Sequence, residues 1–392
     1  MNTDTSVLRR PGLALSQQQQ AQPGKRRRLF CGVIALPRLV FGAFAFGGLA
    51  VSALVLSTLV LSALVFSAGV LASTAAELPA QPVEVRHPDM ARVVAADARL
   101  EVLSDGHQWA EGPVAEPVTG AVLFSDVPKN QIWRWSAETG AVLWLQPAGA
   151  TGYQPSELKE GSNGLLFNQQ GQLVLAQHGD RRLALLTQLP APGSTAGQFS
   201  TLAGQYQGKL LNSPNDLVQA RDGRYFFTDP PYGLKNGDKA TDKQQPVNGV
   251  YQLGTTGEVR LLTGQLSRPN GIALSPDEQY LYVANSDPAA AQWWRLRRDA
   301  QGNYGQAELW LDVTAEVAKA PGLPDGLKVL PDGTLLATGP GGVWVISADK
   351  QVLGVIRTGV AAANVALNAE QNLLYITASA YLLRIELAAQ TQ

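Results

Sequence analysis

The chain has very little of the chemistry that thiol catalysis and soft-metal sites require. Its 392 residues include one cysteine and three histidines. The cysteine, Cys31, precedes the part that we expect to fold, so that part has no thiol for a disulfide, a thiolate zinc site or a cysteine nucleophile. A three-histidine zinc site would need all of His87, His107 and His178, and the first two lie near the start of the folded part. Oxygen ligands are therefore the expected donors for any metal.

The chain also lacks an excess of charge of either sign. It has 31 basic and 32 acidic residues, and residues after position 84 hold 24 basic and 29 acidic ones. A mildly acidic body without a basic stripe argues against nucleic acid as a partner. Because 45% of the residues are hydrophobic and only 16% are charged, most of the chain has the composition of a protein with a large buried core.

Two common catalytic motifs are missing as well. No Gly-x-Ser-x-Gly elbow is present, which argues against a serine hydrolase. The glycine-rich piece from Gly339 to Gly342 lacks a following Lys-Ser or Lys-Thr, so we interpret it as a hairpin turn and not as a phosphate-binding loop.

The N-terminal segment has the pattern of a targeting device. Residues 1–24 are polar and are expected to be disordered, and residues 25–76 combine the basic cluster Lys25–Arg28 with an uncharged apolar run over 39–74. This pattern predicts export to the periplasm, either through a cleaved signal or with 39–74 as an inner-membrane anchor. We expect membrane contact only through this segment, a linker over 77–94 and a single folded domain over 95–392.

A unit of two short apolar strands recurs six times in the folded part. The units begin at Glu111, Asn163, Asn215, Asn270, Asp325 and Asn364, with spacings of 52, 52, 55, 55 and 39 residues. Turns such as Asp222-Gly223 and Asp332-Gly333 separate the paired strands, and further strands are expected over 131–135, 249–253 and 342–346. The repeat predicts an all-β fold, a six-bladed β-propeller, because a β-sandwich would not repeat six times in phase.

The first residues of the six units share a chemical character. Equivalent positions of propeller blades are related by rotation about the central channel, so these side-chain oxygens converge if they face it. Two carboxylates and several carboxamides form a hard-oxygen site that suits Ca²⁺, Mg²⁺ or Mn²⁺. The alternative interpretation is that Asn-Gly and Asp-Gly serve only as turn formers, and Asn364 lacks the following glycine. A metal that polarises a carbonyl, next to a carboxylate general base, predicts a hydrolase.

Several of these motifs resemble one protein family. Glu111-Gly112-Pro113, Asn163-Gly164-Leu165, Pro214-Asn215-Asp216, Pro269-Asn270-Gly271 and Pro324-Asp325-Gly326, in this order, are similar to the gluconolactonase/regucalcin (senescence marker protein) family. Thr228-Asp229-Pro230-Pro231-Tyr232-Gly233 resembles the bacterial gluconolactonase branch in particular. The similarity extends from about 95 to 390 and again implies a six-bladed propeller with a Ca²⁺-type metal.

The resemblance also implies roles for individual residues. Glu111, Asn270 and Asp325 would be the primary metal ligands, with Asp325 also the catalytic base, and Asn215 would complete the metal shell or hold substrate. Asn163, His178, Asp229 and Tyr232 would bind substrate, and the segment Asn285-Ser286-Asp287 would lie at the pocket rim. For Asp229, bracing of its loop is an equally open role, and for His178 a role in the core or in bracing a loop is equally open.

We therefore expect a hydrolase that uses one divalent metal, Ca²⁺ first and Mn²⁺, Mg²⁺ or Zn²⁺ as alternatives, to open a sugar lactone. A related ester or organophosphate hydrolase and a non-catalytic binding propeller with a structural metal are the competing functions. Both carboxylates, Glu111 and Asp325, favour catalysis, because a purely structural metal needs no open coordination position.

Overall fold

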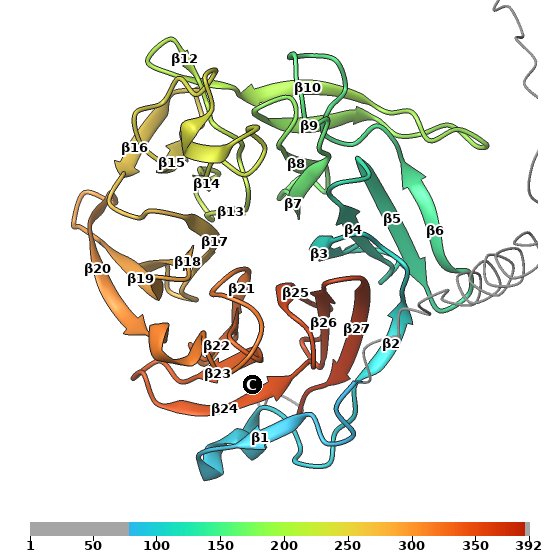
Figure 1. The fold of residues 1–392 in the computed structure, drawn as a ribbon, viewed down its shortest axis with the longest axis vertical. Helices are drawn as coiled ribbons and strands as arrows, with labels where there is room; N and C mark the ends of the chain where they lie inside the picture. The colour runs from blue at the N-terminus through green and yellow to red at the C-terminus, as the bar shows by residue number, and fades with distance from the viewer. Residues whose placement is uncertain (1–77, 389–392) are drawn as a thin grey trace, which may run out of the picture. The chain divides into compact units, whose positions relative to one another are not determined.

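Short apolar segments separated by tight turns form antiparallel strands throughout residues 78–388, which are the residues that this computed structural model describes (Figure 1). The predicted turns have the backbone that glycine permits: φ is +91° at Gly223 and +86° at Gly333. Each of these turns joins the first strand of a sheet to the second, so the predicted hairpins are confirmed.

The strands form six antiparallel blades of four strands each, arranged in a ring about a central axis (Figure 1). From the innermost strand outwards, blade 1 consists of β3 (Ala110–Ala115), β4 (Val122–Asp126), β5 (Gln131–Ser136) and β6 (Gly140–Leu145). Blade 2 consists of β7 (Ser162–Phe167), β8 (Leu173–Gln177), β9 (Arg182–Gln188) and β10 (Gln198–Ala203). Blade 3 consists of β13 (Leu217–Gln219), β14 (Tyr225–Asp229), β15 (Gly249–Leu253) and β16 (Val259–Thr263). The short pair β11 (Gln205–Tyr206) and β12 (Lys209–Leu210) lies between blades 2 and 3.

Blades 4 to 6 repeat this order. Blade 4 consists of β17 (Pro269–Leu274), β18 (Tyr280–Asp287), β19 (Ala290–Arg298) and β20 (Tyr304–Asp312). Blade 5 consists of β21 (Leu327–Val329), β22 (Leu335–Gly339), β23 (Gly342–Ile346) and β24 (Val352–Arg357). Blade 6 consists of β25 (Ala362–Leu367), β26 (Leu373–Ala378), β27 (Tyr381–Glu386) and β2 (Glu101–Ser104). The helical turns among the described residues are the 3₁₀ segments η1 (Pro88–Arg92), η2 (Gly237–Lys239) and η3 (Thr314–Glu316). The predicted all-β, six-bladed propeller is confirmed.

The N-terminal strands are built into the last two blades. β2 pairs with β27, with Glu101 opposite Arg384, and so supplies the outer strand of blade 6. β1 (Val83–Val85) pairs with β24 and adds a fifth strand to blade 5. Residues 77–94, expected to be a linker, thus contain β1 and η1. The expected signal or anchor over 25–76 and the polar residues 1–24 lie outside the described residues. Within 78–388, no helix has the length and apolar character needed to cross a membrane.

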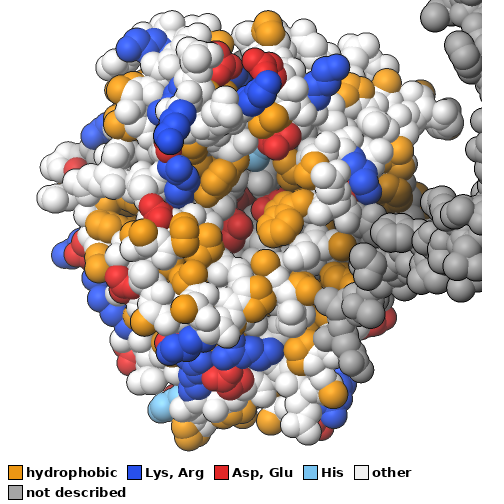
Figure 2. Space-filling model, in the orientation of Figure 1, with side chains coloured by type: hydrophobic (Ala, Val, Ile, Leu, Met, Phe, Trp, Pro, Cys, Tyr) orange, Lys and Arg blue, Asp and Glu red, His pale blue; other side chains and the backbone are white. Residues whose placement is uncertain are grey.

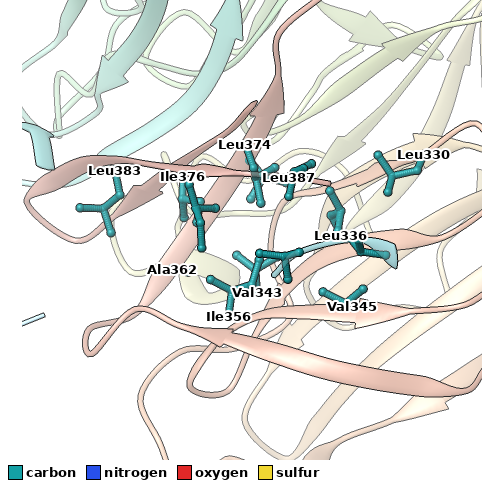
Figure 3. Close-up of a cluster of buried hydrophobic side chains, with 14 of the residues drawn as sticks. Leu330, Leu336, Val343, Val345, Ile356, Ala362, Leu374, Ile376, Leu383 and Leu387 are labelled. Carbon is teal, nitrogen blue, oxygen red and sulfur yellow. The ribbon is translucent and has the colours of Figure 1, made fainter. Parts of the chain in front are cut away.

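Six hydrophobic clusters hold the blades together, one at each interface between neighbouring blades. Figure 3 shows the cluster between blades 5 and 6, where Leu336 and Val343 pack with Ile376 and Leu383. All four side chains are fully buried. Each sheet buries both of its faces against the neighbouring sheets, which is why its strands are apolar over most of their length. Burial of these apolar faces stabilises the ring of blades and keeps the innermost strands in position.

Hydroxyl groups add a second link between neighbouring blades close to the channel. Ser125 Oγ in β4 donates to the carbonyl oxygen of Asn163 in the next blade, at 2.9 Å. Thr228 Oγ1 in β14 donates to the carbonyl oxygen of Asn270 in the blade after it, at 2.6 Å. These buried bonds fix the backbone of the residues whose side chains face the channel.

Candidate active site

The repeat that defines the blades also places polar side chains around the channel. Of the six first residues, Glu111, Asn163, Asn270 and Asn364 lie in the innermost strands β3, β7, β17 and β25, and Asn215 and Asp325 lie two residues before β13 and β21. The pairing register shifts beside four of them, as at a β-bulge. Five of the six line one cavity, and Asn364 does not.

Close contact between neighbouring blades explains the glycine that follows most of these residues. A Cβ on Gly112 would lie 2.0 Å from the carbonyl oxygen of Asn163, and one on Gly271 would lie 2.2 Å from that of Asp325. Both glycines lie inside innermost strands, so these dipeptides do not form hairpin turns. The glycines let the first residue of each unit approach the next blade, which brings the side chains of adjacent blades together.

The cavity has a volume of about 350 Å³, within the range of sites for small ligands. Figure 2 shows acidic side chains in a hollow at the centre of the face that is drawn, with hydrophobic side chains around it. The lining residues are Trp109, Glu111, Val127, Pro128, Glu160, Asn163, His178, Asn215, Tyr232, Asn270, Ser286, Leu323 and Asp325. A single cavity therefore combines polar groups from five blades with a partly apolar wall.

The two carboxylates of the cavity are hard to ionise in the absence of a cation. Burial raises the pKa of Glu111 to about 7, although Glu111 accepts hydrogen bonds from Trp109 Nε1 at 3.3 Å and from the Gly112 N–H at 3.2 Å. Burial also raises the pKa of Asp325 well above its ordinary range, and the charges of Glu111 and Asp216 add to the increase. Three acidic groups so close together favour a bound cation.

The oxygen atoms around these carboxylates have unmet hydrogen-bonding capacity. Asn163 Oδ1, Asn215 Oδ1 and Asp325 Oδ1 are buried and have no hydrogen-bond partner. Buried acceptors without partners are costly, and a hard cation would satisfy several of them at once. Within residues 78–388 no cluster of three His, Cys, Asp or Glu residues suited to a metal is found, so the candidate donor set depends on carboxamides. The oxygen donors present fit a Ca²⁺-type ion, with Glu111, Asn215, Asn270 and Asp325 as candidate ligands.

The structure brings two further predicted residues to the cavity. Tyr232 follows β14, and its side chain is hydrogen-bonded with Ser286 and Asn270; burial and the charge of Asp325 raise its pKa. His178 follows β8 and is 2% exposed, with Nδ1 3.1 Å from Glu160 Oε2. Both positions are compatible with the substrate contacts expected for these residues.

Asp229 is a predicted substrate residue that does not line the cavity. It is fully buried at the end of β14 and accepts hydrogen bonds from the backbone N–H groups of Asn212 and Ser213, at 2.7 and 2.8 Å. Burial raises its pKa to about 7, while these two bonds lower it. In this position Asp229 braces the loop that leads to Asn215, which is the second of the two expected roles.

The structure also shows residues that sequence reasoning missed. Trp109 and Glu160 line the cavity from loops outside the repeat phase, where no pattern marks them. Asp216 is buried next to Asn215 and accepts a hydrogen bond from Asn364 Nδ2 at 3.4 Å. A signal for Asp216 was present, because it occupies the place that a glycine takes in the first, second, fourth and fifth units.

The raised pKa of Glu111 leads to a testable pH dependence in chelated protein. Below pH 4.5, its ordinary pKa, Glu111 is protonated in both states and its stabilising contribution is fully present. As the pH rises towards 7 the unfolded chain releases the proton more readily than the folded one, so this contribution is lost. In urea unfolding experiments with a chelator, we expect the free energy of unfolding to fall less between pH 5 and 7.5 for Glu111→Gln than for the wild type. Equal decreases in the free energy of unfolding for the two proteins would contradict a raised pKa of Glu111.

Comparison with known proteins places this geometry in context. Residues 109–380 match the model of the family described as SMP-30/Gluconolactonase/LRE-like region. The chain is 34% identical over 304 residues to a gluconolactonase of Zymomonas mobilis, covering 76% of this chain and 84% of the relative.

Solved structures have the same architecture. A gluconolactonase from Xanthomonas campestris is 31% identical with a TM-score of 0.67, covering 80% of this chain and 96% of that structure. A calcium-binding protein, regucalcin, from Agrobacterium tumefaciens shares the fold at 16% identity, with a TM-score of 0.56 and coverage of 74% and 95%.

Proposed function

Because the chain belongs to the SMP-30/gluconolactonase/LRE-like family, we propose that it is a lactonase that uses one divalent metal ion to open a sugar lactone. The observation that carries the metal-dependent part of this proposal is the set of buried, unpartnered oxygens of Asn163, Asn215 and Asp325 in a cavity with two carboxylates. Gluconolactonases are the relatives that support the choice of substrate.

The four candidate ligands supply a mixed set of oxygen donors. Glu111 and Asp325 contribute carboxylates from blades 1 and 5, and Asn215 and Asn270 contribute carboxamides from blades 3 and 4. When bound, a divalent cation there would polarise the lactone carbonyl and lower the pKa of a nearby water. Ca²⁺ matches the oxygen set best, and Mg²⁺, Mn²⁺ and Zn²⁺ are the alternatives to compare.

Asp325 is the residue that we propose as general base. Its side chain lines the cavity, and Asp325 Oδ1 has no hydrogen-bond partner, so this oxygen is free to take a proton from water. The water oxygen forms a bond to the lactone carbonyl carbon, the ring C–O bond breaks, and the proton leaves with the ring oxygen as a new hydroxyl. The product is the open-chain hydroxy acid. Asp325 ionises more readily when a cation lies next to it, which keeps the base active near neutral pH.

Removal of metal provides the direct test of the proposed function. We expect the purified protein to hydrolyse glucono-1,5-lactone above the spontaneous rate, to lose at least about 100-fold in initial rate after chelation, and to recover with Ca²⁺, Mn²⁺, Mg²⁺ or Zn²⁺. A circular-dichroism spectrum of the chelated protein serves as the control for folding. Turnover that survives complete chelation would contradict metal dependence. A folded, metal-supplied protein without any lactone turnover would contradict the lactonase.

A further inference from the structure

Glu160 and His178 form a hydrogen-bonded pair in the cavity wall, outside the candidate metal ligands; His178 is buried, and the Glu160 side chain is 23% exposed. Glu160 lies just before β7 and His178 just after β8, so both belong to blade 2. The backbone N–H of His178 donates to the carbonyl oxygen of Gly161 at 3.1 Å, which fixes the backbone beside Glu160. The two side chains also meet, because His178 Nδ1 lies 3.1 Å from Glu160 Oε2. The position of the imidazole ring is therefore set by two contacts to the same loop.

The carboxylate determines which ring nitrogen of a neutral His178 carries the proton. A carboxylate accepts hydrogen bonds and does not donate them, so Nδ1 is the protonated nitrogen that donates to Glu160. His178 Nε2 is then a lone-pair acceptor. It is buried and has no hydrogen-bond partner among the described residues. His178 lines the cavity, so a donor group of a bound ligand would satisfy this acceptor.

The chemistry of a lactone limits which of its groups can meet this requirement. The carbonyl and ring oxygens of a lactone only accept hydrogen bonds, and only a hydroxyl substituent on the ring donates one. Three of the other residues that line the cavity, Val127, Pro128 and Leu323, have no side-chain polar group to pair with such a hydroxyl. A lactone without hydroxyls leaves His178 Nε2 buried and unpaired.

We propose that the Glu160–His178 pair is a hydroxyl acceptor that selects lactones with ring hydroxyls over unsubstituted lactones of the same ring size. This inference rests on the proposed lactonase function and specifies its substrate class. A site built to hydrogen-bond a substrate hydroxyl rejects the analogue without it far more strongly than an apolar site does, because the buried polar group then stays unpaired. His178 contacts the substrate in this scheme, and Glu160 is a positioning residue that acts through the imidazole.

The test compares two lactones with the same six-membered ring, glucono-1,5-lactone and δ-valerolactone, on the metal-supplied full chain. We expect wild-type kcat/KM to favour the hydroxylated lactone at least about 1,000-fold. His178→Phe keeps a planar ring without the acceptor. It should lower kcat/KM for glucono-1,5-lactone about 100-fold and change that for δ-valerolactone less than about threefold.

A second variant keeps the test decisive if His178→Phe does not fold. Glu160→Gln places an amide, which both donates and accepts, opposite Nδ1 and so no longer determines the protonated ring nitrogen. We expect a loss of about tenfold on glucono-1,5-lactone only. The matched control is Glu157→Gln in the same loop, whose carboxylate is 71% exposed and pairs with Lys235. This control should match the wild type on both lactones.

The outcomes separate this inference from the function on which it rests. Selective loss on the hydroxylated lactone in His178→Phe or Glu160→Gln supports hydroxyl recognition. Equal losses on both lactones, as for a proton donor to the leaving group, would overturn it, and so would a Glu160→Gln variant that behaves like Glu157→Gln. A wild-type protein that hydrolyses neither lactone would overturn the proposed lactonase itself.

Discussion

Replacing Asp325 by Asn should lower kcat/KM for lactone hydrolysis at least about 1,000-fold and leave the fold intact. Asparagine has nearly the same shape and retains an oxygen that can bind a cation, but it cannot accept a proton from water at neutral pH. Burial and the charges of Glu111 and Asp216 raise the pKa of Asp325, so the variant also removes a buried carboxyl group whose ionisation is unfavourable. We therefore expect the chelated variant to melt at a temperature equal to or above that of the wild type.

The control for Asp325→Asn is the same substitution at an exposed position of the same blade. Asp332 lies in the hairpin turn between β21 and β22, where Asn-Gly forms the turn as readily as Asp-Gly. Asp332→Asn should have wild-type activity and stability. Calorimetric titration with Ca²⁺ separates loss of the base from loss of the metal, since a variant that binds Ca²⁺ but does not turn over identifies the base. Wild-type turnover in Asp325→Asn would refute the assignment.

The second large effect is expected from a single methyl group next to the site. A Cβ at position 271 would lie 2.2 Å from the carbonyl oxygen of Asp325 and 2.6 Å from Gly326 Cα, and neither backbone atom can rotate away. Gly271→Ala should therefore destabilise the protein by about 3 kcal/mol or more, lower the melting temperature by roughly 5 °C, and weaken Ca²⁺ binding because blades 4 and 5 move apart. Thermal unfolding followed by circular dichroism measures the first effect.

Gly305 provides the matched comparison for this substitution. It lies in β20 of the same blade, is exposed, and a Cβ there would have its nearest neighbour at 3.7 Å. Gly305→Ala should change stability by less than about 1 kcal/mol. If Gly271→Ala were as stable as Gly305→Ala, close contact between blades would not be the reason for the glycine after Asn270.

The features that the sequence predicted are those that repeat in phase. Glu111, Asn163, Asn215, Asn270 and Asp325 occupy equivalent places in successive units, and rotation about the channel converts that spacing into a shared cavity. The predicted third strands also appear, as β5, β15 and β23. The reason for the glycines was not visible in the sequence, because the contact that excludes a side chain at Gly112 comes from a residue of the next blade.

Other features depend on contacts that no local pattern records. Glu160, in the loop before β7, is held beside His178, which follows β8, by the contact with His178 Nδ1 and by the bond from the His178 backbone N–H to the Gly161 carbonyl oxygen. The pairing of β1 with β24 joins Val83 to Ile356, so nothing near Val83 in the sequence indicates it. Asn364 shares the repeat phase but donates to Asp216 and does not line the cavity. The place of a residue within the repeat predicts where it lies in its blade. The residue that its side chain contacts depends on the neighbouring blades, which the repeat does not describe.

The pairing of β2 with β27 has a consequence for the order of events during synthesis. The outer strand of blade 6 is synthesised before blades 1 to 5, and the other three strands of blade 6 are synthesised after them. Glu101 therefore meets Arg384 only after all the residues between them have left the ribosome. Until then the growing chain presents the unpaired edge of β2 and the exposed apolar faces of blades 1 and 5, so blade 6 is completed only after the other five blades have been synthesised.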